Sequence, residues 1–370
     1  MSGKAIIVLV TGVIIITGTI MFNITAASTR IVKNFSDYYM RQNTQNIAQS
    51  GVNLAYTQLG KDRTWRAGYS NLALMDGIVN VKVYDTYFDS IKAVAVHSVA
   101  ETDYGSGQKR RDTSVAYLFW AKKQYPVNVK ALLTLNSKAT VSGNATLDAR
   151  DHDMDGNLLP GAGVPAVWST GVNFVLQSNA TKVGGTDLGV DYAPANPVPN
   201  AITKLNQIPP AAGFPQTPDS VFGGMSETMD EGTLKAIAKS GYAGSQYVTD
   251  PNALKYPLSG VTYVEMPTNS PKNEWSSADI LGSGLLVVHN SAHNAILKNA
   301  NGKFKGLIIA DDIVHIHGDI IGGLVAMTNN LSGNVIGNGG ANILFSREAI
   351  VAATKFLDNN GRPNIIAWWE

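Results

Sequence analysis

The first sixty residues carry a hydrophobic pattern that predicts one long helix with two different halves. Residues 5–29 contain no charged side chain, and this apolar stretch is long enough to cross a bilayer as a helix. From Ile31 to Leu59, apolar residues recur at helical intervals, which is typical of a helix that buries one face against a protein domain. The pattern predicts a membrane-inserting helix over residues 1–60 whose second half packs on a globular domain.

Large apolar side chains of this stretch are the candidates for membrane insertion and for helix–helix assembly. Gly12 and Gly18 are small enough to let helices approach closely, although such residues are equally typical of any transmembrane segment. A cleaved signal peptide is the alternative; its charged region would be Lys4 alone, and residues 26–28 come nearest to a cleavage site. The predicted assembly residues are Ile6, Ile7, Leu9, Val13, Ile14, Ile15, Ile16, Ile20 and Phe22.

Three runs of alternating apolar and polar residues follow the helix. They cover residues 78–83, 93–99 and 113–119 and have the period of β-strands. Turn-forming residues between them predict a small antiparallel β-meander within residues 61–126. The apolar residues 365–370 predict one more strand.

Residues 127–370 contain a repeated template of short apolar quartets separated by Gly, Asn and Asp. The quartets begin at Gly284, Gly306, Gly323 and Asn342, at intervals of about 20 residues. Strands that recur in this way bury their apolar side chains by stacking on their neighbours, which predicts a right-handed parallel β-solenoid. Earlier rungs of the same stack are predicted at residues 131–135, 139–141, 145–147, 166–168 and 172–176.

The repeat is interrupted between about residues 192 and 277, where proline is frequent. Acidic residues at the start of segment 230–240 predict a short helix there. We interpret the interruption as an irregular insertion that covers one face of the solenoid. Ser346, followed by good helix formers, predicts a helix over about 346–357 that caps the last rung. The predicted fold class is thus α+β: a long N-terminal helix, a small meander and a solenoid.

Composition excludes several kinds of site. The 370 residues include no cysteine, which excludes disulfides, thiolate metal sites and thiol catalysis. The formal net charge is +1 and only 15% of the residues are charged, so the chain lacks the basic field that nucleic-acid binding needs. Nucleic acid is therefore not an expected partner.

An acidic turn is one candidate ligand site. Asp151, Asp153, Asp155 and Asn157 follow the spacing Asp-x-Asp-x-Asp-Gly-Asn, which gathers oxygen ligands around Ca²⁺. The twelfth loop position is Ala162 instead of a bidentate Glu, which excludes an EF-hand. The segment is either a calcium loop completed by ligands from other parts of the chain or a solvated acidic turn. No other cofactor is expected.

Histidines form the other candidate ligand sites. His315 and His317 lie two residues apart in a predicted strand and would share one face, where two imidazoles can hold a metal ion. The repeat also places His289 beside Asp311 on the adjacent rung. Because no third ligand is indicated, an exposed polar face is the alternative.

Three features of the N-terminal region belong together: the short polar start Met1–Lys4, the apolar stretch, and the segment 41–59, which is similar to the pattern A-x-x-A/S-G-(I/V)-x-x-A. Their combination resembles the type IV pilin and pseudopilin superfamily, in particular the group with a PilX-like N-terminus. Segments 144–157 and 323–350 resemble the β-helical C-terminal domain of PilX-type proteins. Family members usually have a basic leader ending in Gly and a Glu five residues into the mature chain. Here Val8 stands in place of that Glu, so cleavage after Gly3 and an uncleaved anchor are both open.

The resemblance implies a structural subunit of a type IV pilus-like extracellular filament. The chain would polymerise with copies of itself through a bundle of N-terminal helices and would display its solenoid to other pilins or surface glycans. It would lie in the inner membrane as a precursor before it joins a filament at the cell surface. A non-polymerising, membrane-anchored adhesin is the alternative. A β-helix polysaccharide-active enzyme is a competitor from another class, but no acid–base pair is indicated and no catalytic residue is expected.

Overall fold

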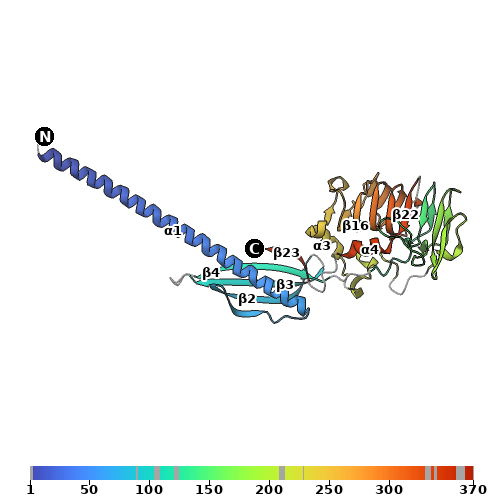
Figure 1. Cartoon of the computed structure of the whole chain (residues 1–370), viewed down its shortest axis with the longest axis horizontal. Helices are drawn as coiled ribbons and strands as arrows, with labels where there is room; N and C mark the ends of the chain where they lie inside the picture. The colour runs from blue at the N-terminus through green and yellow to red at the C-terminus, as the bar shows by residue number, and fades with distance from the viewer. Residues whose placement is uncertain are drawn as a thin grey trace. The chain divides into compact units, whose positions relative to one another are not determined.

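The computed structural model describes residues 3–88, 91–103, 109–120, 125–207, 213–227, 229–329, 335–336, 340–355 and 363–369. One long N-terminal helix is followed mostly by β-sheet, so the α+β class is confirmed (Figure 1). The chain divides into two compact units. The first contains Met1–Tyr84, Ala95–Ala116 and Trp368–Glu370, and the second contains Asp85–Val94 and Tyr117–Ala367.

The helix α1 runs without a break from Gly3 to Lys61, as its periodicity predicts. Its C-terminal part packs on the sheet of the first unit, where Ile47, Val52 and Leu59 are fully buried. Gly51 allows the close approach, because a Cβ there would collide with the hydroxyl oxygen of Ser98 and lie 2.8 Å from a methyl group of Val79. The buried face of the helix is therefore confined to its last turns.

The sheet of the first unit has the strand order β1-β2-β3-β4-β23. The three alternating runs of the sequence lie in β2, β3 and β4, and the last apolar segment forms β23, as predicted. The indole N–H of Trp368 in β23 donates a hydrogen bond of 2.8 Å to Ser114 Oγ in β4. The strand bounds are Tyr69–Leu74 for β1, Gly77–Phe88 for β2, Ile91–Asp103 for β3, Lys109–Phe119 for β4 and Asn364–Trp369 for β23.

The apolar quartets of the repeat lie in one sheet of the second unit, which has the order β11-β10-β7-β22-β20-β18-β16-β14-β13. Neighbouring strands from β13 to β22 pair in parallel. The bounds are Gln246–Val248 for β13, Val261–Glu265 for β14, Gly282–His289 for β16, Lys303–Ala310 for β18, Asp319–Ala326 for β20 and Asn342–Phe345 for β22.

The register of this sheet differs from the repeat by one residue. Gly284 aligns with Gly306, but Gly306 aligns with Gly322 and not with Gly323. The Asn342 strand aligns with the beginning of β20 instead of its apolar quartet. Two consecutive glycines make both alignments equally plausible from the sequence, and the positive φ of 150° at Gly322 matches that of 141° at Gly306.

The order of strands in space also differs from the order in the chain. The apolar end of β20 pairs in parallel with β5, and β22 pairs in parallel with β7. In Figure 1 the green strands therefore lie next to β22. The early rungs extend the sheet beyond β20, whereas the sequence order suggested that they precede β14. Their bounds are Leu133–Leu135 for β5, Thr146–Asp148 for β7, Val167–Ser169 for β8, Lys182–Asp187 for β10, Val190–Ala195 for β11 and Thr203–Lys204 for β12.

The segment 192–277, expected as an insertion, contains part of the same sheet. It includes β13 and β14 of the long sheet, the strand β15, and the helices α2 and α3. Two smaller parallel sheets, β15-β17-β19 and β21-β6-β9, complete the second unit. The remaining bounds are Pro218–Val221 for α2, Thr233–Ser240 for α3, Glu274–Ser276 for β15, Ile296–Ala300 for β17, Asp312–Ile316 for β19, Val335–Ile336 for β21, Ala139–Val141 for β6 and Phe174–Leu176 for β9.

The helix after Ser346 covers the face of a sheet. This helix, α4 (Arg347–Thr354), begins as predicted, because Ser346 Oγ accepts a hydrogen bond of 3.0 Å from the Ala349 N–H. It packs against β16, β18 and β20 instead of capping the last rung, and residues 356–357 of the expected helix lie outside the described residues. Because α4 packs on this sheet, side chains on both faces of β16, β18 and β20 are buried, which explains why the quartets are apolar at consecutive positions.

Candidate functional site

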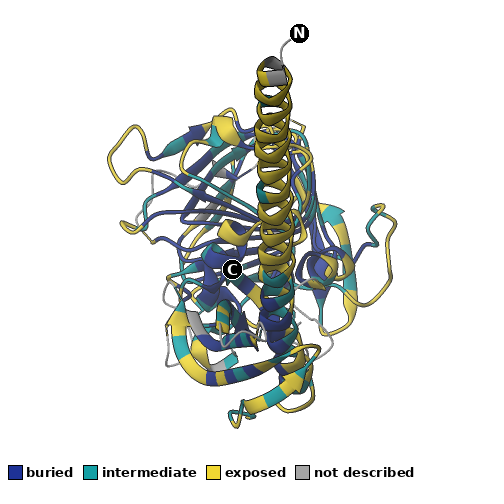
Figure 2. Ribbon diagram, turned by 90° about the vertical axis from the view of Figure 1, so that its left-hand side faces the viewer, coloured by how far each residue is buried: buried dark blue, intermediate teal, exposed yellow. Residues whose placement is uncertain are grey.

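The predicted assembly residues form an uncovered apolar surface on the first half of α1. All nine, from Ile6 to Phe22, are between 53% and 73% exposed. Figure 2 shows this part of the helix as exposed, and burial begins only toward its C-terminal part. The described residues of the chain supply no side chain that covers this surface.

The uncovered surface extends further along α1 than the sequence predicts. Ile31, Phe35 and Tyr39 were expected to pack on the globular domain, but they are 68%, 71% and 56% exposed. Packing starts near Thr44, whose hydroxyl lies 2.6 Å from that of Thr102. The sheet of the first unit therefore covers only the last part of the helix.

The helix α1 has the length and composition of a membrane anchor or of a signal sequence. Among the helices of the described chain it alone is long and apolar enough to cross a membrane, over Ile6–Lys61. A bilayer core requires about 20 apolar residues. The exposed apolar side chains continue to Tyr39, so one bilayer covers only part of them.

The residues of the acidic turn point to different partners. Asp151 is buried, and its Oδ1 accepts a hydrogen bond of 2.9 Å from the backbone N–H of Arg347 in α4. Asp155 is exposed, with its Oδ1 3.3 Å from Lys305 Nζ in β18. Two of the three predicted carboxylates are thus engaged by separate basic residues.

Asp153 closes the turn on itself. Its carboxylate accepts two backbone N–H hydrogen bonds of 2.8 Å, from Asp155 and Asn157, and a third of 2.8 Å from the Asn157 side chain. These contacts, led by the Asn157 side chain, lower the pKa of Asp153. Donors of the turn itself therefore satisfy this carboxylate.

The expected adjacency of His289 and Asp311 is confirmed. His289 Nδ1 lies 2.6 Å from Asp311 Oδ1, and Asp311 is fully buried. The rings of His315 and His317 are also close, with centroids 6.3 Å apart, and His315 Nδ1 lies 3.2 Å from the side-chain oxygen of Asn299. Burial, and then the nearby His317, lower the pKa of His315.

A polar cleft of ≈ 610 Å³, which the sequence did not indicate, lies beside β14, β16 and α3. Lys235 Nζ donates a hydrogen bond of 2.8 Å to Glu265, and the hydroxyl of Tyr247 donates another to the same carboxylate. Burial raises the pKa of Glu265, but these two donors outweigh it and leave the pKa below its ordinary value. Burial and the hydrogen bond to Glu265 raise the pKa of Tyr247 to about 12.

Sequence reasoning missed this cleft because its residues come from separate segments, three of them inside the expected insertion. A signal was present in the repeat itself. Glu265 aligns with His289 in the parallel register of β14 and β16, and His289 lies beside Asp311 at the end of β18. An alignment that included β14 would have placed three ionisable residues in one row.

Comparisons of the chain with protein families, with curated proteins and with solved structures each found no match. The resemblance to the type IV pilins stays a prediction from the sequence.

Proposed function

We propose that the protein is a structural subunit of a type IV pilus-like filament. The subunit assembles through the exposed apolar part of α1 and displays its second unit as a non-catalytic surface module. The membrane holds it before assembly, and copies of the same chain are its partners in the filament.

The length of the uncovered apolar surface carries this proposal. At about 1.5 Å per residue, the helix from Ile6 to Tyr39 spans roughly 50 Å, whereas the hydrocarbon core of a bilayer is about 30 Å thick. Phe35, Tyr38 and Tyr39 are each more than half exposed in the single chain. A bilayer that covers the start of the helix does not reach them. Helices of neighbouring copies would cover the whole length.

For the second unit we propose a right-handed β-solenoid. The parallel pairings of the long sheet and of the two smaller sheets support this fold, because consecutive strands of the chain alternate between sheets. β15, β17 and β19 pair with one another, and in the chain they alternate with β16, β18 and β20, which also pair with one another. Such a coil forms a stiff body with broad faces, which suits contact with surfaces or neighbouring subunits.

Two substitutions separate assembly from membrane insertion. Ile15→Asp places a charge in the centre of the apolar stretch, where it costs about 2.5 to 3.5 kcal/mol in a bilayer, so we expect loss of both insertion and filaments. Phe35→Asp lies beyond the part that lipid needs to cover, so we expect normal membrane recovery but loss of filaments. Ile15→Val is the matched control and should behave as the wild type.

Electron microscopy of material sheared from producing cells, with immunoblots of the membrane fraction, measures both outcomes. Filaments that contain Phe35→Asp chains at the wild-type level would overturn the assembly role. Wild-type chains found only in the membrane fraction, with no filament, would favour the non-polymerising adhesin.

A further inference from the structure

His289, His293 and Asp311 form a cluster beside the polar cleft, which both histidines line. One ligand atom from each residue lies within 4.8 Å of the others, and no other group of three such side chains was found among the described residues. The rings of His289 and His293 are 5.2 Å apart between centroids. Both histidines line the cleft, so an ion bound between them is reachable from solvent.

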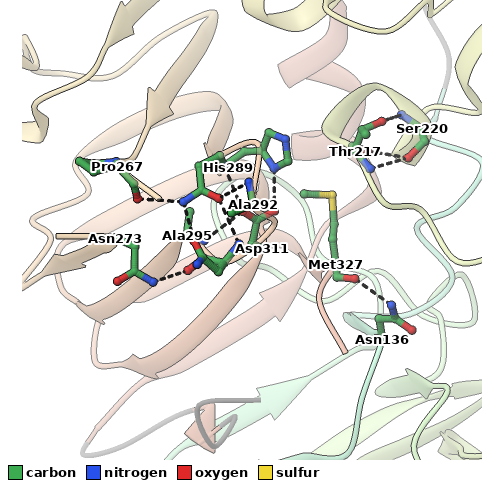
Figure 3. A network of polar contacts seen from close by, with 12 residues as sticks. Asn136, Thr217, Ser220, Pro267, Asn273, His289, Ala292, Ala295, Asp311 and Met327 are labelled. Atoms are coloured by element: carbon green, nitrogen blue, oxygen red, sulfur yellow. Dashed lines mark hydrogen bonds and ion pairs between the residues drawn. The ribbon is translucent and has the colours of Figure 1, made fainter. Parts of the chain in front are cut away.

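Asp311 is held in place by backbone donors from the loop that carries His293. Its Oδ2 accepts hydrogen bonds from the N–H groups of Asn290, at 3.1 Å, and Ala295, at 3.0 Å. Figure 3 shows Asp311 between His289 and Ala295, with dashed lines to both. The carboxylate is therefore oriented before any ligand arrives, which lowers the entropic cost of binding an ion.

Three asparagines fix the loop 290–294. The Asn290 side-chain oxygen accepts from the N–H groups of Ala292 and Asn294, each at 3.1 Å. Its Nδ2 donates to the Asn294 side-chain oxygen at 2.7 Å and to the Pro267 carbonyl at 3.0 Å. Asn273 Nδ2 donates to the Asn294 carbonyl at 2.7 Å (Figure 3). This network of hydrogen bonds determines the position of His293 in the loop.

The network leaves His293 with features that suit a ligand. Its φ is +52°, a conformation that costs a non-glycine residue energy and that occurs often at functional positions. Its Nδ1 is buried and has no hydrogen-bond partner among the residues that the structure describes. A buried ring nitrogen without a partner is unfavourable, and coordination of an ion would satisfy it.

We infer that His289, His293 and Asp311 bind one divalent transition-metal ion of the Zn²⁺ class. Two imidazoles and a carboxylate are typical ligands of Zn²⁺, whereas Ca²⁺ and Mg²⁺ prefer oxygen alone. In a tetrahedral site with bonds of about 2.0 to 2.2 Å, ligand atoms are about 3.3 Å apart. The 2.6 Å contact between His289 and Asp311 must therefore open by less than about 1 Å, and His289 then carries its proton on Nε2.

A fourth coordination position would be open to the cleft, because both histidines line it. Glu265 lies beside His289 in the register of β14 and β16, but Lys235 and Tyr247 already engage its carboxylate. Three protein ligands with one open position are the pattern of sites that exchange a water or a substrate oxygen. The site is independent of the assembly role of α1.

The test measures metal bound to the full chain purified in detergent. Chelator-stripped protein is dialysed against Zn²⁺, and the bound zinc is measured by elemental analysis. We expect one equivalent per chain. With Co²⁺ as the probe, we expect visible absorption bands of a four- or five-coordinate site with nitrogen and oxygen ligands.

His293→Asn and His293→Gly are the test variants, because both residues tolerate a positive φ and so preserve the loop. We expect at least a tenfold loss of Zn²⁺ affinity in each and disappearance of the Co²⁺ bands. His317→Ala is the matched control, since it breaks the other close histidine pair, and it should bind metal as the wild type does. Equal zinc binding by the wild type and both His293 variants, or loss of binding in His317→Ala alone, would overturn the assignment.

Discussion

Gly322 lies directly beside Gly306 in the parallel register of β18 and β20, and both residues have positive φ angles. A Cβ on Gly322 would overlap the carbonyl oxygen of Gly306, and a Cβ on Gly306 would overlap that of Gly284. Gly284, Gly306 and Gly322 thus form a column in which three backbones approach too closely for any side chain.

Substitution of the central glycine of this column should therefore destabilise the second unit. We expect Gly306→Ala to lower the free energy of unfolding by more than about 2 kcal/mol, because it adds both a strained φ and a steric overlap with backbone. Gly340→Ala is the control: no atom of the described residues lies within 4 Å of its added Cβ, so its effect should stay within about 0.5 kcal/mol. Denaturant unfolding of both variants checks this, and equal midpoints would contradict the packing described for the column.

Alanine substitutions at Gly51 and Gly18 should have different effects on the stability of the single chain. Gly51→Ala forces α1 away from β2 and β3, and we expect a loss of about 1 to 3 kcal/mol in the stability of the first unit. Gly18→Ala meets nothing within 4 Å and improves helix propensity, so the single chain should not lose stability. Thermal unfolding followed by circular dichroism measures both, and a lower melting temperature for Gly18→Ala than for Gly51→Ala would refute this assignment.

Asp219 should make stability depend on pH. It is buried, and its two oxygens accept hydrogen bonds from the N–H groups of Leu234, at 2.8 Å, and Gly232, at 3.0 Å, at the start of α3. Burial raises the pKa of Asp219 from 3.8 to about 8. Because the folded pKa lies above the unfolded pKa, the stability that this group contributes is complete below about pH 4 and is lost as the pH rises through about 8.

Unfolding midpoints between about pH 5 and pH 9 measure this effect. The expected slope approaches about 1.4 kcal/mol per pH unit for one proton. Asp219→Asn cannot ionise, so it should flatten the slope even though it loses one acceptor and lowers stability at all pH values. An unchanged slope in this variant would assign the pH dependence to other groups.

The acidic turn should not respond to calcium. Asp153 is satisfied by donors of its own loop and Asp151 by the backbone of Arg347, so an ion would have to displace existing hydrogen bonds. We expect the melting temperature of metal-free protein to stay constant when Ca²⁺ is added. A rise with Ca²⁺ that disappears in Asp153→Asn would show that the turn rearranges into a calcium loop, since an ion bound only by the native state stabilises it.

Local features of the fold were predictable from the sequence. The helix α1 follows from its periodicity, because each of its backbone hydrogen bonds joins residues four apart in the chain. Ser346 predicts the start of α4 for the same reason, since an N-cap involves only the next few residues. The repeat indicated which segments form strands and brought His289 beside Asp311.

Relations between distant segments were decided by the tertiary structure alone. The two consecutive glycines at 322 and 323 fit the repeat equally well, and only the backbone approach to Gly306 selects Gly322. Likewise, β5 and β7 continue the sheet beyond β20, although they precede it in the chain. The sequence by itself determined the helices α1 and α4 and the strands of the repeat, because those patterns depend on neighbouring residues. Strand order, the unpartnered length of α1 and the position of His293 depend on packing between residues far apart in the chain, which no local pattern contains.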